Sequence, residues 1–155
     1  MFTLKYRQRV PLSLEACWEF FSSPANLKTI TPTHLDFKMK SASYEGKMYP
    51  GQLIAYTIRP VLNFPIEWVT EITHVEELTY FIDEQRFGPY KFWHHEHRFY
   101  AISGGVEMVD TISYKVPFGF LGKLLNHLKI KSDIEEIFAY RRTKLEEIFG
   151  IYSES

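Results

Sequence analysis

The first residues of the chain alternate between apolar and polar side chains, which predicts a strand. Positions 2, 4 and 6 are apolar and positions 3, 5 and 7 are polar, so we expect a strand over Phe2–Val10. After Pro11 the period changes, and apolar residues recur at helical spacing over residues 13–22. Ser13 is placed to cap this helix. A second short helix is expected from Ser23-Pro24, because Pro is favoured at the first helical position.

Six further segments alternate in the same way and predict the rest of a sheet. Three of them cover residues 35–40, 52–59 and 66–75. The other three lie between Tyr80 and Val116, where Gly88-Pro89 and Ser103-Gly104-Gly105 separate runs rich in aromatic and β-branched residues. Such runs joined by tight turns are typical of an antiparallel meander.

A helical pattern follows the last strand. Residues 117–122 interrupt the alternation, and beyond them apolar residues recur with a period of 3.6 up to Phe149. We expect one long helix, with a bend allowed near Lys131-Ser132 and Gly150 as its cap. At roughly 1.5 Å per residue, about 28 residues are enough to cross a small domain. The apolar patch around Phe118 at the start of this helix would either anchor the helix or form a lid over a cavity.

The order of these elements predicts an α+β fold. It consists of a strand, two short helices, six strands and a long helix, so we expect about seven strands in a curved antiparallel sheet. The long helix must bury its apolar stripe on the concave face of that sheet. We expect residues 1–150 to form a single domain and residues 151–155 to be a tail.

Composition narrows the classes of function. The 155 residues suit one domain with a sizeable core. A net charge of -1 provides no field that would recruit nucleic acid or an acidic membrane. The lone cysteine, Cys17, excludes an internal disulfide, and we interpret it as a buried, unreactive thiol. No apolar run approaches membrane-spanning length, so we expect a cytoplasmic protein without membrane insertion. The pattern does not indicate an oligomeric state.

The sixth predicted strand carries the residues with most chemical potential. Alternation places Trp93, His95, His97 and Phe99 on one face, and we take this face as the inner one because the opposite face carries two charges. On the seventh strand Asp110 shares a face with Tyr114. An even number of residues in the turn at 103–105 keeps His97 and Asp110 on one face, opposite or diagonal to each other.

The adjacency of His97 and Asp110 has two interpretations. An oriented imidazole inside a cavity can act as an acid or base or bind a polar group of a ligand, so both residues are candidate catalytic residues. A satisfied buried pair would only hold the register of the strands.

The inner face of the fifth strand depends on the turn at Gly88-Pro89. A two-residue turn would direct Glu84 inward, whereas an odd loop or a bulge would direct Asp83 and Gln85 inward. Arg141 lies within the apolar stripe of the last helix, where a buried cation needs a partner. It would hold an inward carboxylate or an anionic ligand, or else extend past the sheet edge to water.

The order of elements is accompanied by several distinctive local pieces, which are Phe81-Ile82-Asp83-Glu84-Gln85, Gly88-Pro89, Trp93-His94-His95-Glu96-His97-Arg98-Phe99, Asp110 and Pro117-Phe118-Gly119. With them, nearly the whole chain resembles the START-like, or SRPBCC, superfamily of helix-grip proteins, which includes lipid carriers and polyketide cyclases. The local pieces look like those of a bacterial subgroup of small ligand-binding members. The resemblance implies a deep cavity between sheet and helix, and it favours Asp83 and Gln85 as the inward pair on the fifth strand.

The favoured function is therefore binding of a small hydrophobic or amphipathic ligand, such as a lipid, polyketide or aromatic compound. Aromatic side chains are expected to line the cavity, among them Trp18, Phe37, Tyr56, Trp68, Trp93, Phe99 and Tyr114. The candidate ligand-binding residues are Trp68, Asp83, Gln85, Trp93, His95, His97, Phe99, Asp110, Tyr114 and Arg141. Two alternatives stay open: a cyclase or dehydratase that uses His97 and Asp110, and a protein-interaction module with a filled cavity.

The same residues also include types that bind metal ions. His95, His97 and Asp110 would make a two-histidine, one-carboxylate set. A strand holds the backbones of residues i and i+2 about 7 Å apart, so we do not expect the imidazoles of His95 and His97 to bind one metal ion together. We therefore expect neither a metal nor another cofactor.

Overall fold

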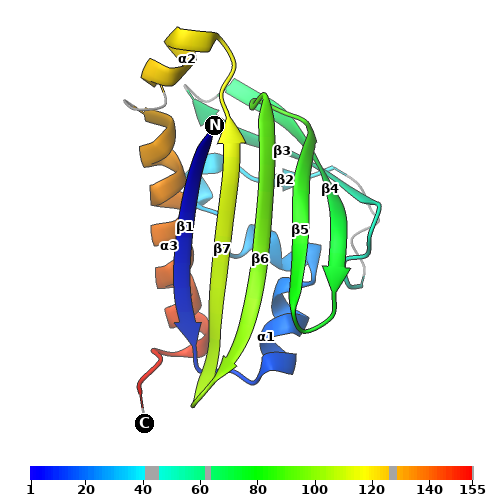
Figure 1. Ribbon diagram of the computed structural model, residues 1–155, viewed down its shortest axis with the longest axis vertical. Helices are drawn as coiled ribbons and strands as arrows, with labels where there is room; N and C mark the ends of the chain where they lie inside the picture. Colours follow the sequence, from blue (N-terminus) through cyan, green and yellow to red (C-terminus); the bar gives the residue numbers. More distant parts are fainter. Residues whose placement is uncertain (41–45, 62–63, 126–128, 155) are drawn as a thin grey trace.

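A seven-stranded antiparallel sheet forms the wall on which the rest of the protein is arranged (Figure 1). The computed structural model describes residues 1–40, 46–61, 64–125 and 129–154. The order of strands across the sheet is β1-β7-β6-β5-β4-β3-β2. The strands are β1 (Phe2–Val10), β2 (Lys38–Met39), β3 (Gln52–Val61), β4 (Phe64–Glu76), β5 (Tyr80–Phe87), β6 (Phe92–Ile102) and β7 (Gly105–Lys115).

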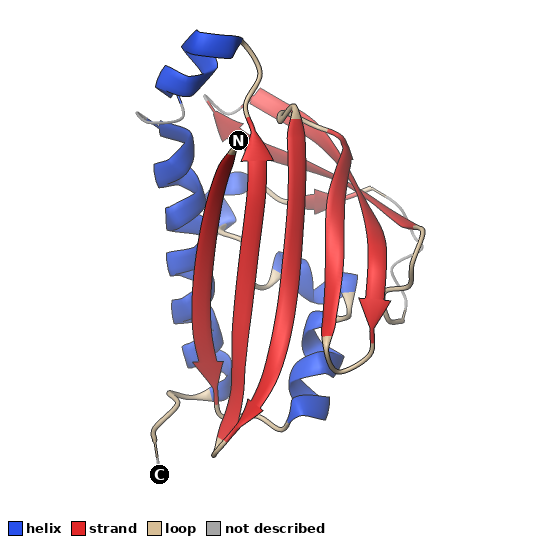
Figure 2. Ribbon diagram, in the orientation of Figure 1, coloured by secondary structure: helices blue, strands red, loops and turns tan. Residues whose placement is uncertain are grey.

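Except for α2, the helices lie on one face of the curved sheet (Figure 2). The first group comprises α1 (Leu14–Phe21) and two 3₁₀ helices, η1 (Pro24–Lys28) and η2 (Thr33–Leu35). Two helices follow the last strand, α2 (Gly119–Leu125) and α3 (Lys131–Phe149). This is the predicted α+β arrangement, a helix-grip fold in which the sheet curves around α3. No helix within the described residues is long and apolar enough to cross a membrane.

Local sequence explains the first elements. Along β1 the residues alternate between exposed and half-buried as far as Val10, which is buried. The hydroxyl of Ser13 accepts a hydrogen bond from the backbone N–H of Ala16 at 3.1 Å, so the predicted cap of α1 is confirmed. The helix predicted from Pro24 is present as a 3₁₀ helix, η1, rather than an α-helix.

The sequence predicts one long C-terminal helix with a bend allowed near Lys131-Ser132. The structure describes two helices, α2 and α3, of which α3 begins at Lys131, and residues 126–128 lie outside the described part. Figure 1 shows α2 beyond the ends of the strands, whereas α3 runs along the sheet. Leu121 and Leu124 are exposed, because α2 has no sheet beneath it to bury its apolar side chains. Gly150 caps α3 with a positive φ of 92°, as predicted.

The two turns of the meander set its register. Ser103 and Gly104 close a two-residue turn, which pairs Ile102 with Gly105 and His97 with Asp110. The adjacency of His97 and Asp110 is therefore confirmed. At the other turn, a two-residue loop at Gly88-Pro89 would pair Glu84 with Trp93. The structure instead pairs Glu84 with His94, so the loop is longer by one residue. The side chain of Gln85 stabilises this longer turn by bonding the backbone N–H and C=O of Tyr90.

Three groups of buried apolar residues hold the layers together. One joins α1 to the sheet and the C-terminal part of α3 through Trp18, Phe21, Phe99 and Leu145. A second lies near the start of α3 and contains Ile112, Tyr114, Ile134 and Phe138. A third lies on the far strands and contains Phe37, Ile58 and Trp68. Residues of all three groups line the cavity described next.

Candidate functional site

The described residues enclose a cavity of about 680 Å³ between the concave face of the sheet and α3. This size falls within the range of small-molecule sites, roughly 300–1,000 Å³. Most of the lining is apolar and comes from the short helices, β3, β4 and α3. It includes Leu27, Ile30, Phe37, Ile54, Ile58, Ile72, Ile134 and Phe138. The space under α3 is therefore not filled by side chains.

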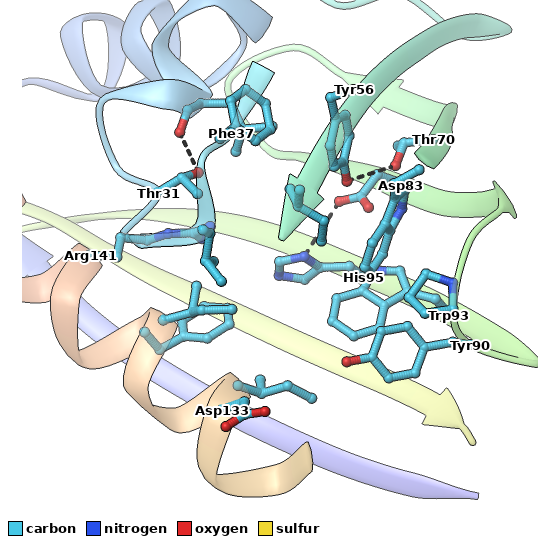
Figure 3. Close-up of a pocket in the computed structure, with 18 of the residues that line it drawn as sticks. Thr31, Phe37, Tyr56, Thr70, Asp83, Tyr90, Trp93, His95, Asp133 and Arg141 are labelled. Atoms are coloured by element: carbon cyan, nitrogen blue, oxygen red, sulfur yellow. Dashed lines mark hydrogen bonds and ion pairs between the residues drawn. The ribbon is translucent and has the colours of Figure 1, made fainter. Parts of the chain in front are cut away.

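An aromatic wall forms one side of the cavity. Trp68 on β4 is its centre, with ring centroids 5.9 Å from Tyr56, 5.4 Å from Tyr90 and 5.2 Å from Trp93. Phe37 extends the wall, with its ring 4.9 Å from that of Tyr56. Figure 3 shows Tyr56, Tyr90 and Trp93 gathered on the sheet side of the pocket. Rings in such arrangements are rigid and present large apolar faces to a ligand.

Ionisable side chains interrupt this apolar lining. Asp83 from β5 and His95 and His97 from β6 line the cavity, and Arg141 reaches it from α3 (Figure 3). Asp110 lies behind the histidines and does not line this cavity. We refer to Asp83, His95, His97 and Asp110 as the His–Asp cluster.

Each histidine of the cluster lies between the two carboxylates. The Nε2 atom of His95 is 3.0 Å from Oδ1 of Asp110, and its Nδ1 atom is 3.4 Å from Oδ2 of Asp83. For His97 the roles of the ring nitrogens are reversed: Nδ1 is 2.8 Å from Oδ1 of Asp110, and Nε2 is 2.8 Å from Oδ2 of Asp83. The two imidazole rings lie side by side, with centroids 3.7 Å apart.

Strand register explains this arrangement. β6 lies between β5 and β7, and its inward histidines are at positions 95 and 97. Asp83 is directly opposite His95, and Asp110 is directly opposite His97. Each carboxylate therefore also has the other histidine as its diagonal neighbour, within reach of a side chain.

The pKa values of the two imidazoles are shifted in opposite directions. Burial favours a neutral His97, but hydrogen bonds to Asp110 and Asp83 outweigh burial, so the pKa of His97 is raised. Burial together with the nearby His97 lowers the pKa of His95.

The two carboxylates are both held in the ionised form. Burial alone would raise the pKa of Asp110, yet the hydrogen bonds from His95 and His97 hold this pKa far below its usual value. The same opposition acts on Asp83: burial alone would raise its pKa, but the charges of His95 and His97 and a hydrogen bond from His97 lower it.

Arg141 is a buried cation whose polar atoms are only partly satisfied. Its side chain is 10% exposed, and Nη1 lies 3.7 Å from Oδ1 of Asp110. The guanidinium carbon is 4.7 Å from the ring centroid of Phe138. Among the described residues, Nε of Arg141 has no hydrogen-bond partner. The arginine therefore stays inside the protein rather than extending to water.

The structure brings six of the predicted binding residues to the cavity, and four lie elsewhere. Those at the cavity are Trp68, Asp83, Trp93, His95, His97 and Arg141. Gln85 shares the face of Asp83 but is engaged in the turn. Phe99 packs against Trp18 and Phe81, and Tyr114 is fully buried beside Ile112. Gln85, Phe99, Asp110 and Tyr114 therefore do not line this cavity, and for the residues of β6 and β7 the reason is that sharing a strand face does not distinguish a cavity wall from packed core.

Several lining residues were not among the predicted binding residues. Tyr90 lies in the turn after β5, where no periodicity signals its direction. Phe138 and Ile134 belong to the apolar stripe of α3, so the helical period could have indicated them. Pro117, Phe118 and Gly122 also line the cavity, which places the start of α2 beside it.

Comparison with known proteins identifies the fold. No protein-family model matches the chain, and no curated protein matches it. Solved structures do match. A protein from Mycobacterium smegmatis is 15% identical with a TM-score of 0.69, over 94% of this chain and 89% of that one. A protein from Thermus thermophilus is 16% identical with a TM-score of 0.68, over 94% of each chain.

A plant protein has the same architecture. The ginseng major latex-like protein 151 from Panax ginseng is 11% identical with a TM-score of 0.68, over 96% of this chain and 97% of that one. At such identities the likeness shows the helix-grip fold alone, and function has to be argued from the site.

Proposed function

We propose that the protein binds a small, mainly hydrophobic molecule that carries one acidic or polar group. The observation that supports this proposal is an apolar cavity of about 680 Å³ with a partly unsatisfied buried cation, Arg141, in its wall. The aromatic wall around Trp68 would contact the body of the ligand. The polar group would lie near Arg141 and the His–Asp cluster. As part of this proposal, the chain is a small ligand-binding member of the START-like superfamily.

The geometry favours binding over acid–base catalysis by His97 and Asp110. Both ring nitrogens of His97 lie 2.8 Å from a carboxylate oxygen, Nδ1 from Asp110 and Nε2 from Asp83, so neither nitrogen is left to exchange a proton with a ligand. Arg141, in contrast, lines the cavity directly. A charge-assisted hydrogen bond from a guanidinium to a carboxylate contributes about 1.5–3 kcal/mol. Such a bond would select acids over neutral molecules of similar shape.

The test compares an acid with the corresponding alcohol. The fluorescent probe 1-anilinonaphthalene-8-sulfonate is titrated into the protein, and decanoic acid and decan-1-ol are used to displace it. We expect displacement by both, with the acid binding more tightly. Arg141→Met should weaken binding of the acid about tenfold or more, which corresponds to the loss of one charge-assisted hydrogen bond, and should leave binding of the alcohol nearly unchanged. The neighbouring Arg142→Met is the control, because Arg142 is exposed, bonds the backbone carbonyl of Arg7 and does not line the cavity.

A second variant tests whether the ligand enters this cavity. Ile54 is buried and lines the cavity, so Ile54→Trp would occupy part of its volume. We expect this variant to unfold cooperatively and to lose probe and acid binding. Absence of binding by the wild-type protein, or equal effects of Arg141→Met and Arg142→Met on the acid, would overturn the proposal.

A further inference from the structure

Three electron-pair donors converge at one point of the His–Asp cluster. The Nδ1 atom of His95 and the Nε2 atom of His97 both face the same oxygen, Oδ2 of Asp83, at 3.4 and 2.8 Å. One ligand atom from each of these residues lies within 4.8 Å of the others. Among the described residues this is the one group of three histidine, cysteine or carboxylate side chains close enough to share an ion.

Asp110 orients both rings from the opposite side. Its Oδ1 atom lies 3.0 Å from Nε2 of His95 and 2.8 Å from Nδ1 of His97. When each neutral imidazole donates its single N–H to Asp110, the remaining nitrogen of each ring presents a lone pair toward Asp83. In metal sites, the ring nitrogen of a histidine that does not bind the metal commonly donates its N–H to a carboxylate, which fixes the orientation of the ring. Here one carboxylate orients two histidines at once.

The spacing of the three donors matches that of ligands around one ion. Two ligands bound at about 2.1 Å stand roughly 3.0 Å apart at an octahedral angle and roughly 3.4 Å apart at a tetrahedral angle. The contacts of Asp83 with His97 and His95, at 2.8 and 3.4 Å, are close to these values. All three residues also line the cavity, so further coordination positions would face a bound molecule.

We infer that Asp83, His95 and His97 bind a divalent transition metal ion, such as Zn²⁺ or Fe²⁺, at the wall of the cavity. Two imidazoles and one carboxylate form a donor set that such ions accept. This donor set differs from the one considered from the sequence, which contained Asp110 in place of Asp83 and for which we expected no metal. The strand backbone does separate the two histidines, but their side chains incline toward each other, with ring centroids 3.7 Å apart. The buried negative charge of Asp83 would then be balanced by the ion.

The first experiment uses the metal alone, without an organic ligand. Protein freed of metal by a chelator is dialysed against Zn²⁺ or Co²⁺ at neutral pH, and bound metal is measured by atomic emission. We expect one equivalent per chain, and for Co²⁺ a visible absorption spectrum of a protein-bound ion. The result is independent of ligand binding, so a failure here leaves the proposed function standing.

Variants locate the site. Asp83→Asn and His97→Ala should each weaken Zn²⁺ binding at least tenfold. Asp110→Asn should weaken Zn²⁺ binding by roughly 10–100-fold, the usual effect of losing a carboxylate that orients a metal-binding histidine. The matched control is His94→Ala, because His94 on the same strand forms an equivalent contact with Glu84 on the opposite face, at 2.8 Å. This variant should bind Zn²⁺ as the wild type does.

A measurement on the wild-type protein covers the case in which a variant fails to fold. The ¹⁵N resonances of the histidine rings distinguish the coordinating nitrogen, and Zn²⁺ should shift Nδ1 of His95 and Nε2 of His97. No bound metal after dialysis, coordination through other nitrogens, or an equal loss of binding in His94→Ala would overturn the inference. The first of these outcomes would mean that a proton on His97 satisfies the cluster.

Discussion

Replacing Arg141 by Met should leave the free energy of unfolding within about 1 kcal/mol of the wild-type value, although the residue is buried. The favourable contribution of the arginine is its attraction to Asp110. With Nη1 and Oδ1 separated by 3.7 Å, this attraction is about 4.5 kcal/mol at an effective dielectric constant of about 20. Taken alone, it would predict a large loss of stability.

Two costs oppose that attraction, and their sum is similar to it in size. Removing a cation from water costs several kcal/mol, and the unpartnered Nε atom adds about 1–3 kcal/mol. Met avoids both costs and still packs beside Phe138. Asp110 is not left alone in the variant, because His95 and His97 remain within hydrogen-bond distance of it. The opposing contributions therefore nearly cancel.

Urea unfolding followed by circular dichroism measures the difference, with Arg142→Met as the control for loss of a surface charge. An unchanged slope of the unfolding free energy against urea concentration would show that unfolding exposes a similar amount of surface in all three proteins. A loss of more than about 3 kcal/mol in Arg141→Met would refute the reasoning. Arg141 would then be a structural partner of Asp110, and its burial would need no ligand to explain it.

Three further predictions concern the packing of the fold. Leu145→Ala should cost about 2–5 kcal/mol of unfolding free energy because Leu145 is fully buried, whereas Ile148→Ala on the exposed side of α3 should cost less than about 1 kcal/mol; chemical denaturation compares them. Burial raises the pKa of Cys17 to about 12, so its thiol stays protonated at pH 8 and should react with Ellman's reagent only after denaturation; prompt reaction of the folded protein would contradict its position. Gly122→Ala should displace α2, because the added carbon would lie 1.8 Å from the carbonyl oxygen of Pro117; hydrogen exchange over residues 119–125 should accelerate, and unchanged protection would count against this close approach.

Much of the fold could be predicted because its signals are local. The alternation along β1 and the cap at Ser13 depend on residues within a few positions of one another. The pairing of His97 with Asp110 was also predictable, because a short turn joins their strands and an even loop preserves the face. The position of α2 beyond the ends of the strands was not, because the apolar period continues through α2 although it has no sheet to pack against.

The candidate site shows where local patterns stop being informative. The inward direction of Asp83 follows from a turn of irregular length, in which Gln85 bonds the backbone of Tyr90. A change of one residue in that register would have directed Glu84 inward instead. The same limit applies to depth: Phe99 and Trp93 share a face of β6, yet only Trp93 borders the cavity.

Periodicity along the chain was sufficient to predict the strands, the main helices, the α+β class and the inner face of β6. These properties follow from which neighbouring side chains can be buried together, and that information is present in every short segment. The tertiary structure decided which carboxylate faces the cavity, which aromatic residues form its wall, and that the nitrogens of two histidines converge on Asp83. The reason is that these relations depend on turn geometry and on the curvature of the sheet around α3, which bring together residues distant in sequence.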